Sequence, residues 1–206
     1  MTTVTGPDGV ERCRWSGSAP EFLAYHDTEW GYPIGDDTRL FEKICLEGFQ
    51  SGLSWRTILN KRESFRAAFA QFDFERVVRF GDQDVERLLQ DQGIVRHRGK
   101  IAATINNAQR ACDAAERHGS LAAFVWQYEP DPAEVPEPQT MSASPTSIRM
   151  SKDLKRLGWK FVGPTTVFAF MQAMGLINDH AKRCAMRAKA DLARTNFKPP
   201  ASSTPS

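Results

Sequence analysis

The chain has 206 residues with nearly balanced charge, since 27 lysines and arginines are offset by 25 acidic residues to give a formal net charge of +2. This length suits one domain or two lobes that share a core. The apolar stretches are too short to cross a bilayer, so we expect a soluble protein without a membrane partner. Met1 to Val10 lacks a basic start followed by an apolar run, so we expect no secretory signal, a cytoplasmic location and free or metal-bound thiols.

Helical signals recur along the chain and strand signals are almost absent, which predicts an all-α fold. Residues with good capping chemistry precede apolar positions at helical spacing, and glycines follow several of these segments. We expect Gly93 and Gly119 to end two of the helices and a last helix to hold His180 and Cys184. The other expected helices begin, in chain order, at or next to Thr38, Ser54, Asp73, Asp82, Arg98, Ser120, Ser151 and Pro164.

Three segments have the composition of irregular structure. Residues 1–11 are expected to form a flexible N-terminal extension, and residues 130–145 a surface loop rich in proline and small polar residues. Residues 195–206 contain mainly proline, serine and threonine after the last apolar positions, which predicts a disordered tail. The remainder, residues 12–194, is interpreted as a single domain with two helical lobes.

Two cysteines and two histidines near the ends of this domain have the chemistry of a closed zinc site, which commonly takes two thiolates and two imidazoles. His180 and Cys184 are four residues apart, so on a helix they would share one face. Cys13 and His26 would need a bend to meet. The alternative is that all four are ordinary packed side chains, because their spacing differs from that of zinc fingers. If all four do bind one ion, its role is structural, since a catalytic zinc keeps one position for water.

A second group of residues combines one acid with several aromatic rings. Glu47 lies in an otherwise apolar helical stretch, where a buried carboxylate needs a partner or a function. Flat rings around one hydrogen-bond acceptor are what a pocket for a flipped purine requires. Each ring alone is more often a core residue, and only the combination points to a base pocket. The rings near Glu47 in sequence are Trp15, Tyr25, Trp30 and Trp55.

Two further segments have features of DNA-binding loops. Gln50, Gly52 and Leu53 lie where one helix should end and the next begin, and a leucine at an exposed tip can act as a wedge in stacked bases. Gly163 can bring the backbone close to a ligand. After Pro164, the amides of Thr165 and Thr166 lie at a helix N-terminus, which is a site for a phosphate. The alternative for this second segment is an ordinary helical hairpin.

Several long and uncommon segments resemble the DNA-3-methyladenine glycosylase I family of the helix-hairpin-helix DNA glycosylase superfamily. The similarity extends from about Arg12 to Cys184. The matching segments are Tyr25-His-Asp-Thr-Glu-Trp-Gly31, Cys45-Leu-Glu-Gly-Phe-Gln-Ser-Gly-Leu-Ser-Trp55, Gly93-Ile-Val-Arg-His-Arg-Gly-Lys100, Phe161-Val-Gly163 and Met171-Gln-Ala-Met-Gly-Leu-Ile-Asn-Asp-His180.

This resemblance implies a helix-hairpin-helix glycosylase-like fold in which one structural zinc ion joins the N- and C-terminal segments. It implies that the protein flips 3-methyladenine out of alkylated double-stranded DNA and hydrolyses its glycosidic bond without cutting the strand. It also implies that Glu47 reads the base, with Tyr25 as the second catalytic residue and the tryptophans as base-binding residues. We expect the active form to be a monomer.

The chain departs from the superfamily pattern in two places. Many members have Gly-x-Gly in the hairpin, and here Phe161 stands at the first glycine position. Many also carry a catalytic aspartate after the hairpin. Here Asp179 is adjacent to the expected metal ligand His180, so we assign it no catalytic role.

Two other classes of function stay open from the sequence. A protein that binds damaged DNA without releasing a base would keep the hairpin and the wedge, but it would have less need of Glu47 beside aromatic rings. A hydrolase that uses zinc-bound water is disfavoured, because all four coordination positions are taken by protein ligands.

Overall fold

The computed structural model describes residues 2–135 and 137–202, and most of them are helical, as expected. No described helix is both long and apolar enough to span a membrane. In chain order the elements are β1 (Thr3–Thr5), β2 (Glu11–Cys13), η1 (Arg14–Gly17), α1 (Pro20–Thr28), α2 (Asp37–Gln50), α3 (Trp55–Asn60), α4 (Arg62–Ala68), η2 (Ala70–Phe72), α5 (Phe74–Val77), α6 (Asp82–Gln90), α7 (Arg98–His118), α8 (Leu121–Trp126), η3 (Pro132–Glu134), α9 (Pro145–Arg156), α10 (Pro164–Ala173) and α11 (Ala185–Asn196).

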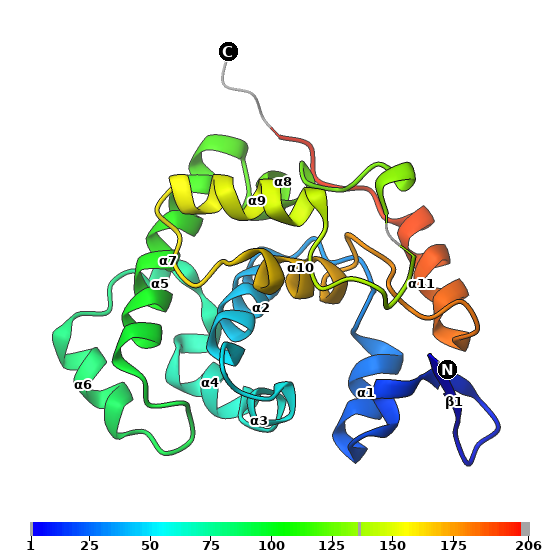
Figure 1. The fold of residues 1–206 in the computed structure, drawn as a ribbon. Helices are drawn as coiled ribbons and strands as arrows, with labels where there is room; N and C mark the ends of the chain where they lie inside the picture. Colours follow the sequence, from blue (N-terminus) through cyan, green and yellow to red (C-terminus); the bar gives the residue numbers. More distant parts are fainter. Residues whose placement is uncertain (1, 136, 203–206) are drawn as a thin grey trace.

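Helix α2 lies in the middle of the molecule, with α4 to α7 on one side and α1 on the other (Figure 1). Every residue from 40 to 49 is buried, which is the pattern of a helix covered on all sides. Its N-cap is Asp36, whose side chain accepts a hydrogen bond from the Arg39 amide, and not Thr38 as expected. A helix this deeply buried holds its polar side chains at fixed positions in the interior.

A cluster of phenylalanines forms the core beside α2. The rings of Phe49 and Phe65 lie 4.6 Å apart, and Phe69 stacks on Phe72 at 5.7 Å. All four side chains are fully buried. Aromatic side chains bury a large apolar area per residue, so this cluster packs tightly against α2 and stabilises its position.

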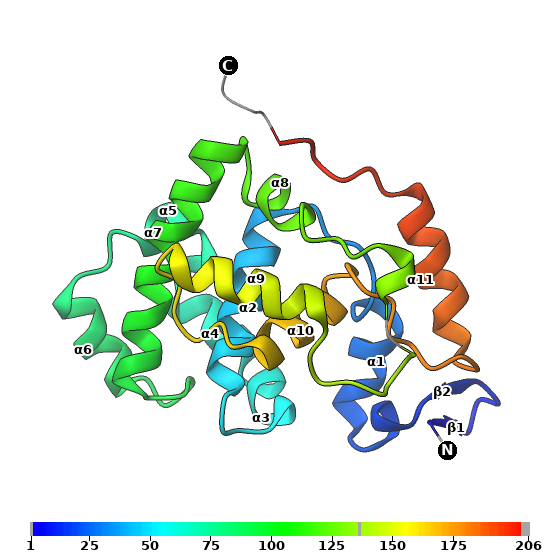
Figure 2. The same cartoon turned by 45° about the horizontal axis from the view of Figure 1, so that its top comes forward.

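The two ends of the domain lie side by side. In Figures 1 and 2 the blue hairpin and α1 lie next to the orange segment that leads into α11. Strands β1 and β2 pair antiparallel with Thr3 opposite Cys13, and the Ala181 amide donates to Cys13 Sγ at 3.3 Å. This hairpin was not predicted, because strands of three residues are too short to show an alternating apolar pattern.

Several helix boundaries differ from the expected ones. Helix α9 begins at Pro145, capped by Ser144, and not at Ser151, because its first turn buries small polar residues that show no apolar period. The expected helix after Ser54 is broken at Lys61 into α3 and α4. Helix α6 begins after Gly81 and ends at Gln90, so Gly93 is not its left-handed end. The long helix α7 does end at Gly119, with φ of 87°.

The last helix differs most from expectation, since α11 begins at Ala185 and neither His180 nor Cys184 lies within it. Beyond α11, the Phe197 ring packs on Trp126 at 4.7 Å, and in the last turn of the helix Arg194 pairs with Glu129. The first residues of the expected tail therefore contact the domain. Residues 203–206 of that tail lie outside the described residues, and disorder there stays a prediction.

Candidate active site and metal cluster

Glu47 lies near the C-terminal end of α2, and its side chain is only 5% exposed. One turn earlier on the same helix, Lys43 Nζ lies 2.9 Å from Glu47 Oε1 and donates to Tyr25 Oη at 2.6 Å. Burial raises the pKa of Tyr25 well above its usual value, and the Glu47 charge adds to this effect. Tyr25 is therefore a neutral phenol that accepts from Lys43.

Glu47 borders a cavity of about 340 Å³, the size of a site for a small molecule. The rings of Tyr25 and Trp55 lie 5.4 Å apart, and those of Trp15 and Trp30 lie 5.1 Å apart. The aromatic residues expected at the pocket therefore all meet at one cavity. Its lining consists of Trp15, Tyr25, Trp30, Glu47, Gln50, Trp55, Gln139, Met141, Ala169, Gln172 and Asp179.

Asp179 is a cavity residue that the sequence analysis set aside. Its carboxylate accepts hydrogen bonds from the Gln139 amide at 3.0 Å and from Gln172 Nε2 at 2.6 Å. Burial raises the pKa of Asp179 despite these two bonds. One signal in the sequence could have identified Asp179: it directly precedes His180, so it must lie close to the cluster and to the cavity beside it. Gln139 gave no such signal, because it lies in the irregular loop.

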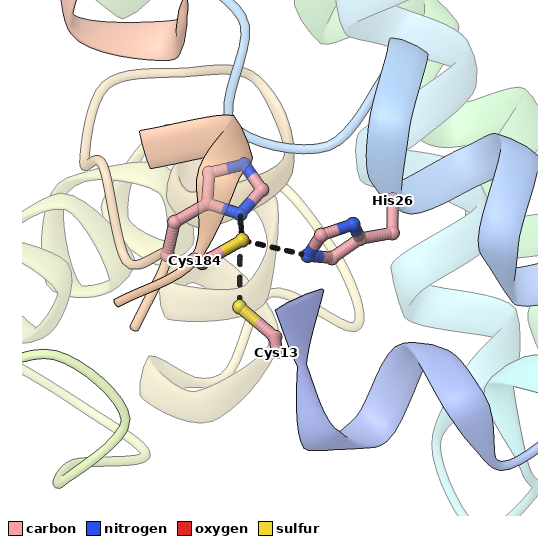
Figure 3. Close-up of side chains that lie close together, drawn as sticks. Cys13, His26 and Cys184 are labelled. Carbon is pink, nitrogen blue, oxygen red and sulfur yellow. Dashed lines mark hydrogen bonds between the residues drawn. The ribbon is translucent and has the colours of Figure 1, made fainter. Parts of the chain in front are cut away.

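The four expected metal ligands come together in one buried cluster. Their ligand atoms all lie within 4.8 Å of one another, so these four residues could hold a metal ion. Cys184 Sγ lies 3.5 Å from His26 Nε2 and 3.5 Å from His180 Nδ1 (Figure 3). Cys13 Sγ lies 3.7 Å from the same His180 nitrogen. The four residues predicted from the sequence therefore do come together, although His180 and Cys184 do not share a helix as expected.

The chain reaches the cluster by turns and not by a helical face. Cys13 ends β2, and η1 then turns the chain into α1, which carries His26. The Cys184 amide donates to the Ala181 carbonyl at 2.8 Å in a tight turn just before α11. Spacing of four residues therefore brought His180 and Cys184 together through a turn.

The outer nitrogen of each histidine is also held. His26 Nδ1 lies 2.7 Å from Asp27 Oδ1, and His180 Nε2 lies 3.0 Å from the Trp30 carbonyl. Such outer partners fix the ring orientation and select the nitrogen that faces a metal. Hydrogen bonds from Cys13 and both imidazoles lower the pKa of Cys184, which favours a thiolate.

The loop between α2 and α3 presents Leu53 on the surface. Gly52 has φ of 79°, a conformation suited to glycine, and Leu53 is 42% exposed. The loop is fastened from beneath, because the Lys100 ammonium donates to the Phe49 carbonyl at 2.8 Å and to the Ser51 carbonyl. Leu53 is thus an exposed apolar side chain on a fixed loop, next to the cavity residue Gln50.

Helices α9 and α10 form a hairpin closed by residues 157–163. Asn107 holds the turn from α7, accepting from the Lys160 amide at 2.8 Å and donating to the Lys160 carbonyl at 3.0 Å. Phe161 adopts φ of 55°, so it takes up the left-handed conformation although it is not glycine. A side chain built at Gly163 would meet no described atom within 4 Å, which leaves this end of α10 open to a ligand.

The amides at the start of α10 are free of backbone partners in the described chain. Pro164 is the first residue of the helix, as expected, and the first amide with an intrahelical bond is that of Val167, which donates to the Gly163 carbonyl. Thr165 and Thr166 therefore offer N–H groups at the positive end of a helix dipole. This geometry suits an anion.

The arrangement supports one kind of chemistry better than others. An open cavity with aromatic walls and one buried carboxylate suits a planar base with hydrogen-bond donors. The cysteine and histidine cluster is a separate, fully buried site beside it. Leu53 and the start of α10 supply an apolar tip and an anion site outside the cavity.

Comparison with known proteins agrees with this geometry. Residues 15–188 match the family model described as methyladenine glycosylase. DNA-3-methyladenine glycosylase 1 of Escherichia coli (strain K12) is 49% identical over 179 residues, covering 85% of this chain and 96% of that protein. The DNA-3-methyladenine glycosylase of Haemophilus influenzae is 43% identical over 178 residues, covering 84% of this chain and 96% of that protein.

Solved structures extend the similarity to the fold. A crystal structure of 3-methyladenine DNA glycosylase I superposes with a TM-score of 0.79 at 46% identity, covering 84% of this chain and 98% of that one. A variant of such an enzyme in complex with 3-methyladenine gives a TM-score of 0.79 at 36% identity, covering 85% and 97%. The chain described here therefore belongs to the methyladenine glycosylase family.

Proposed function

We propose that this protein is a DNA glycosylase that excises 3-methyladenine from alkylated DNA by hydrolysis of the N-glycosidic bond. The observation that carries this proposal is the buried Glu47 carboxylate at the edge of a cavity with aromatic walls. Two relatives are named for the same activity, and one related structure holds 3-methyladenine. The proposed substrate is double-stranded DNA, and the acting unit is a monomer in the cytoplasm.

The lesion supplies much of its own reactivity. Methylation at N3 makes the adenine base in DNA positively charged, so it leaves the sugar as a neutral molecule. The aromatic walls hold the charged base by cation–π attraction, worth roughly 0.5–2 kcal/mol. Glu47 Oε1 is occupied by Lys43, and Oε2 is left to accept from the N–H groups of the base.

The bond between the sugar and the base then breaks with its electron pair moving to the base. Water adds to the sugar carbon and loses a proton to solvent or to a cavity acceptor. Tyr25, held neutral by burial, supplies a hydroxyl at the cavity wall. Lysine is missing from the described residues that line the cavity, so no amine is placed to form an adduct with the sugar. We therefore infer base release without strand cleavage.

The α9–α10 hairpin and the Leu53 loop serve as the DNA contacts in this proposal. The free amides of Thr165 and Thr166 would bind a phosphate, and the open backbone at Gly163 would let it approach. Leu53 would fill the space left in the base stack when the nucleotide swings out, with Gln50 and Gly52 beside it. The hairpin would act as the helix-hairpin-helix motif of the superfamily.

We further propose that the cluster of Cys13, His26, His180 and Cys184 holds one structural zinc ion. In a tetrahedral site with bonds of about 2.0–2.3 Å, neighbouring ligand atoms lie about 3.4–3.8 Å apart. The sulfur–nitrogen distances of 3.5, 3.5 and 3.7 Å fit this requirement. Bound zinc would tie the start of the domain to its end, with no position left for water.

The test of the proposed function is the release of bases from methylated duplex DNA, followed by chromatography. We expect free 3-methyladenine, an abasic strand that stays intact, and no release from undamaged DNA. A protein that only binds damaged DNA would shift the duplex and release nothing. A hydrolase using zinc-bound water would lose activity on metal removal while staying folded, whereas a structural zinc predicts loss of the fold.

A further inference from the structure

A buried lysine lies beside the proposed base-reading acid. Lys43 has a side chain only 7% exposed, and its ammonium contacts Glu47 Oε1 at 2.9 Å and Tyr25 Oη at 2.6 Å. The ammonium also lies 3.5 Å from the centre of the Trp55 ring, within the range of a strong cation–π contact. The ammonium therefore has three partners in the wall of the cavity: Glu47, Tyr25 and the Trp55 ring.

Lys43 lies behind this wall and not in the cavity. It lines a second, smaller cavity of about 100 Å³, which shares Tyr25 and Trp55 with the larger one. The larger cavity is lined by Glu47, Tyr25 and Trp55 but not by Lys43. A base in the larger cavity would therefore contact Tyr25 and Trp55, and the Lys43 ammonium already lies behind these two residues.

This arrangement is unexpected for a pocket that takes a cation. A lone buried carboxylate would attract a charged base strongly, because few solvent molecules screen the interaction. The paired ammonium cancels that charge, and its contact with Trp55 competes with the base for the same ring electrons. Burial lowers the pKa of Lys43, and the neighbouring Glu47 opposes this effect.

We propose that Lys43 is a positioning residue that determines how the pocket selects bases, by neutralising Glu47 so that shape and hydrogen bonds count for more than charge. The inference rests on the proposed function. It extends the substrate class from cationic methylated adenines to neutral purines with the same outline and the same N–H groups. Lys43 also aims Glu47 Oε2 toward the base by holding Oε1.

The same charge balance matters for the reaction. As the glycosidic bond breaks, positive charge leaves the base and develops on the sugar. A pocket with an uncompensated Glu47 would stabilise the bound cationic substrate more than the transition state, which slows the reaction. Removing the Lys43 charge should therefore tighten substrate binding and lower the rate at saturation, a pattern that indicates excess ground-state stabilisation.

The experiment compares wild type with Lys43→Met and Lys43→Gln. Calorimetry measures binding of two probes: neutral 3-methyladenine in mildly alkaline buffer, and the permanent cation made by methylating that base at the nitrogen that carries the sugar in DNA. Single-turnover base release from methylated duplex gives the rate at saturation and the half-saturating protein concentration. Lys189→Met on the exposed face of α11 is the matched control, since it removes one positive charge far from Glu47 in sequence.

In both Lys43 variants we expect the ratio of cation affinity to neutral-base affinity to rise roughly tenfold or more, because a unit charge near the base is removed. The saturating rate should fall and half-saturation should occur at lower concentration. A ratio equal to that of wild type, or one that rises only in Lys43→Met, would overturn the proposal. The glutamine variant keeps a hydrogen-bond donor, so it separates charge from hydrogen bonding. Wild type that binds neither probe and releases no base would instead overturn the proposed function itself.

Discussion

The cavity beside Glu47 and the cluster of Cys13, His26, His180 and Cys184 are built from the same segments, yet they have opposite properties. Trp15 follows Cys13 by two residues, Tyr25 precedes His26, and Asp179 precedes His180. Each pair sends one side chain to the cavity and one to the cluster.

The cluster is fully buried, and both of its histidines have outer partners. The cavity is open and is lined by the Glu47 side chain. The cluster therefore holds in place the segments that also form the wall of the cavity.

The largest effect is expected from removing the proposed zinc ion. Cys184→Ala, or treatment with a chelator, should lower the free energy of unfolding by several kcal/mol, because metal binding contributes to folding. Thermal unfolding and elemental analysis measure the effect. Cys112→Ala is the control, since this half-buried cysteine is outside the cluster and should keep the metal. Unchanged thermal stability without metal would contradict the structural role.

The second prediction separates two buried acids on the same helix. Glu47→Gln should reduce base release by about a hundredfold or more, because the amide is a weaker acceptor for the N–H groups of the base and leaves the buried Lys43 ammonium without its counter-ion. Glu42→Gln should instead lower stability and preserve base release, since Glu42 pairs with Arg66 at 2.8 Å within the supporting lobe.

Base release and thermal unfolding of both variants provide the measurements. Equal loss of activity in the two variants would mean that Glu47 acts only through the fold.

The smallest expected effect concerns the exposed loop. Leu53→Ala should weaken binding to duplex DNA about fivefold with little change in stability, because its side chain is 42% exposed and a wedge contributes mainly in the complex. Leu192→Ala is the matched control, as Leu192 is 63% exposed on α11. Fluorescence anisotropy with a methylated duplex measures the affinity. An unaltered affinity for the Leu53 variant would assign that residue to packing.

Helices with a strong apolar period or a clear cap were predictable from the sequence. Asp73, Ser120 and Pro164 begin helices as expected, because capping and proline effects act over a few neighbouring residues. The β1–β2 hairpin and the first turns of α9 were not predictable, since their apolar residues follow neither the two-residue period of a strand nor the 3.6-residue period of a helix. The same limit explains the wrong helix at His180, where a turn reproduces the separation that a helix would give.

The site was predictable to a different degree. Residue chemistry alone selected the four cluster residues and Glu47, and resemblance to a family strengthened both. The places of Gln139, Asp179 and Lys43 at the site became clear only from the fold. Gln139 lies in an irregular loop, Asp179 is next to the stronger candidate His180, and Lys43 lies on a mostly apolar helix.

The candidate side chains and many of the helices could be read from the chain alone, because both depend on residue type and on neighbours within one or two turns. The fold was needed to show that a turn, and not a helix, brings His180 and Cys184 together, and that Lys43 lies behind the wall formed by Tyr25 and Trp55. The physical reason is that both depend on contacts between segments far apart in the chain. Their geometry follows from how the helices pack around α2, and no local pattern records it.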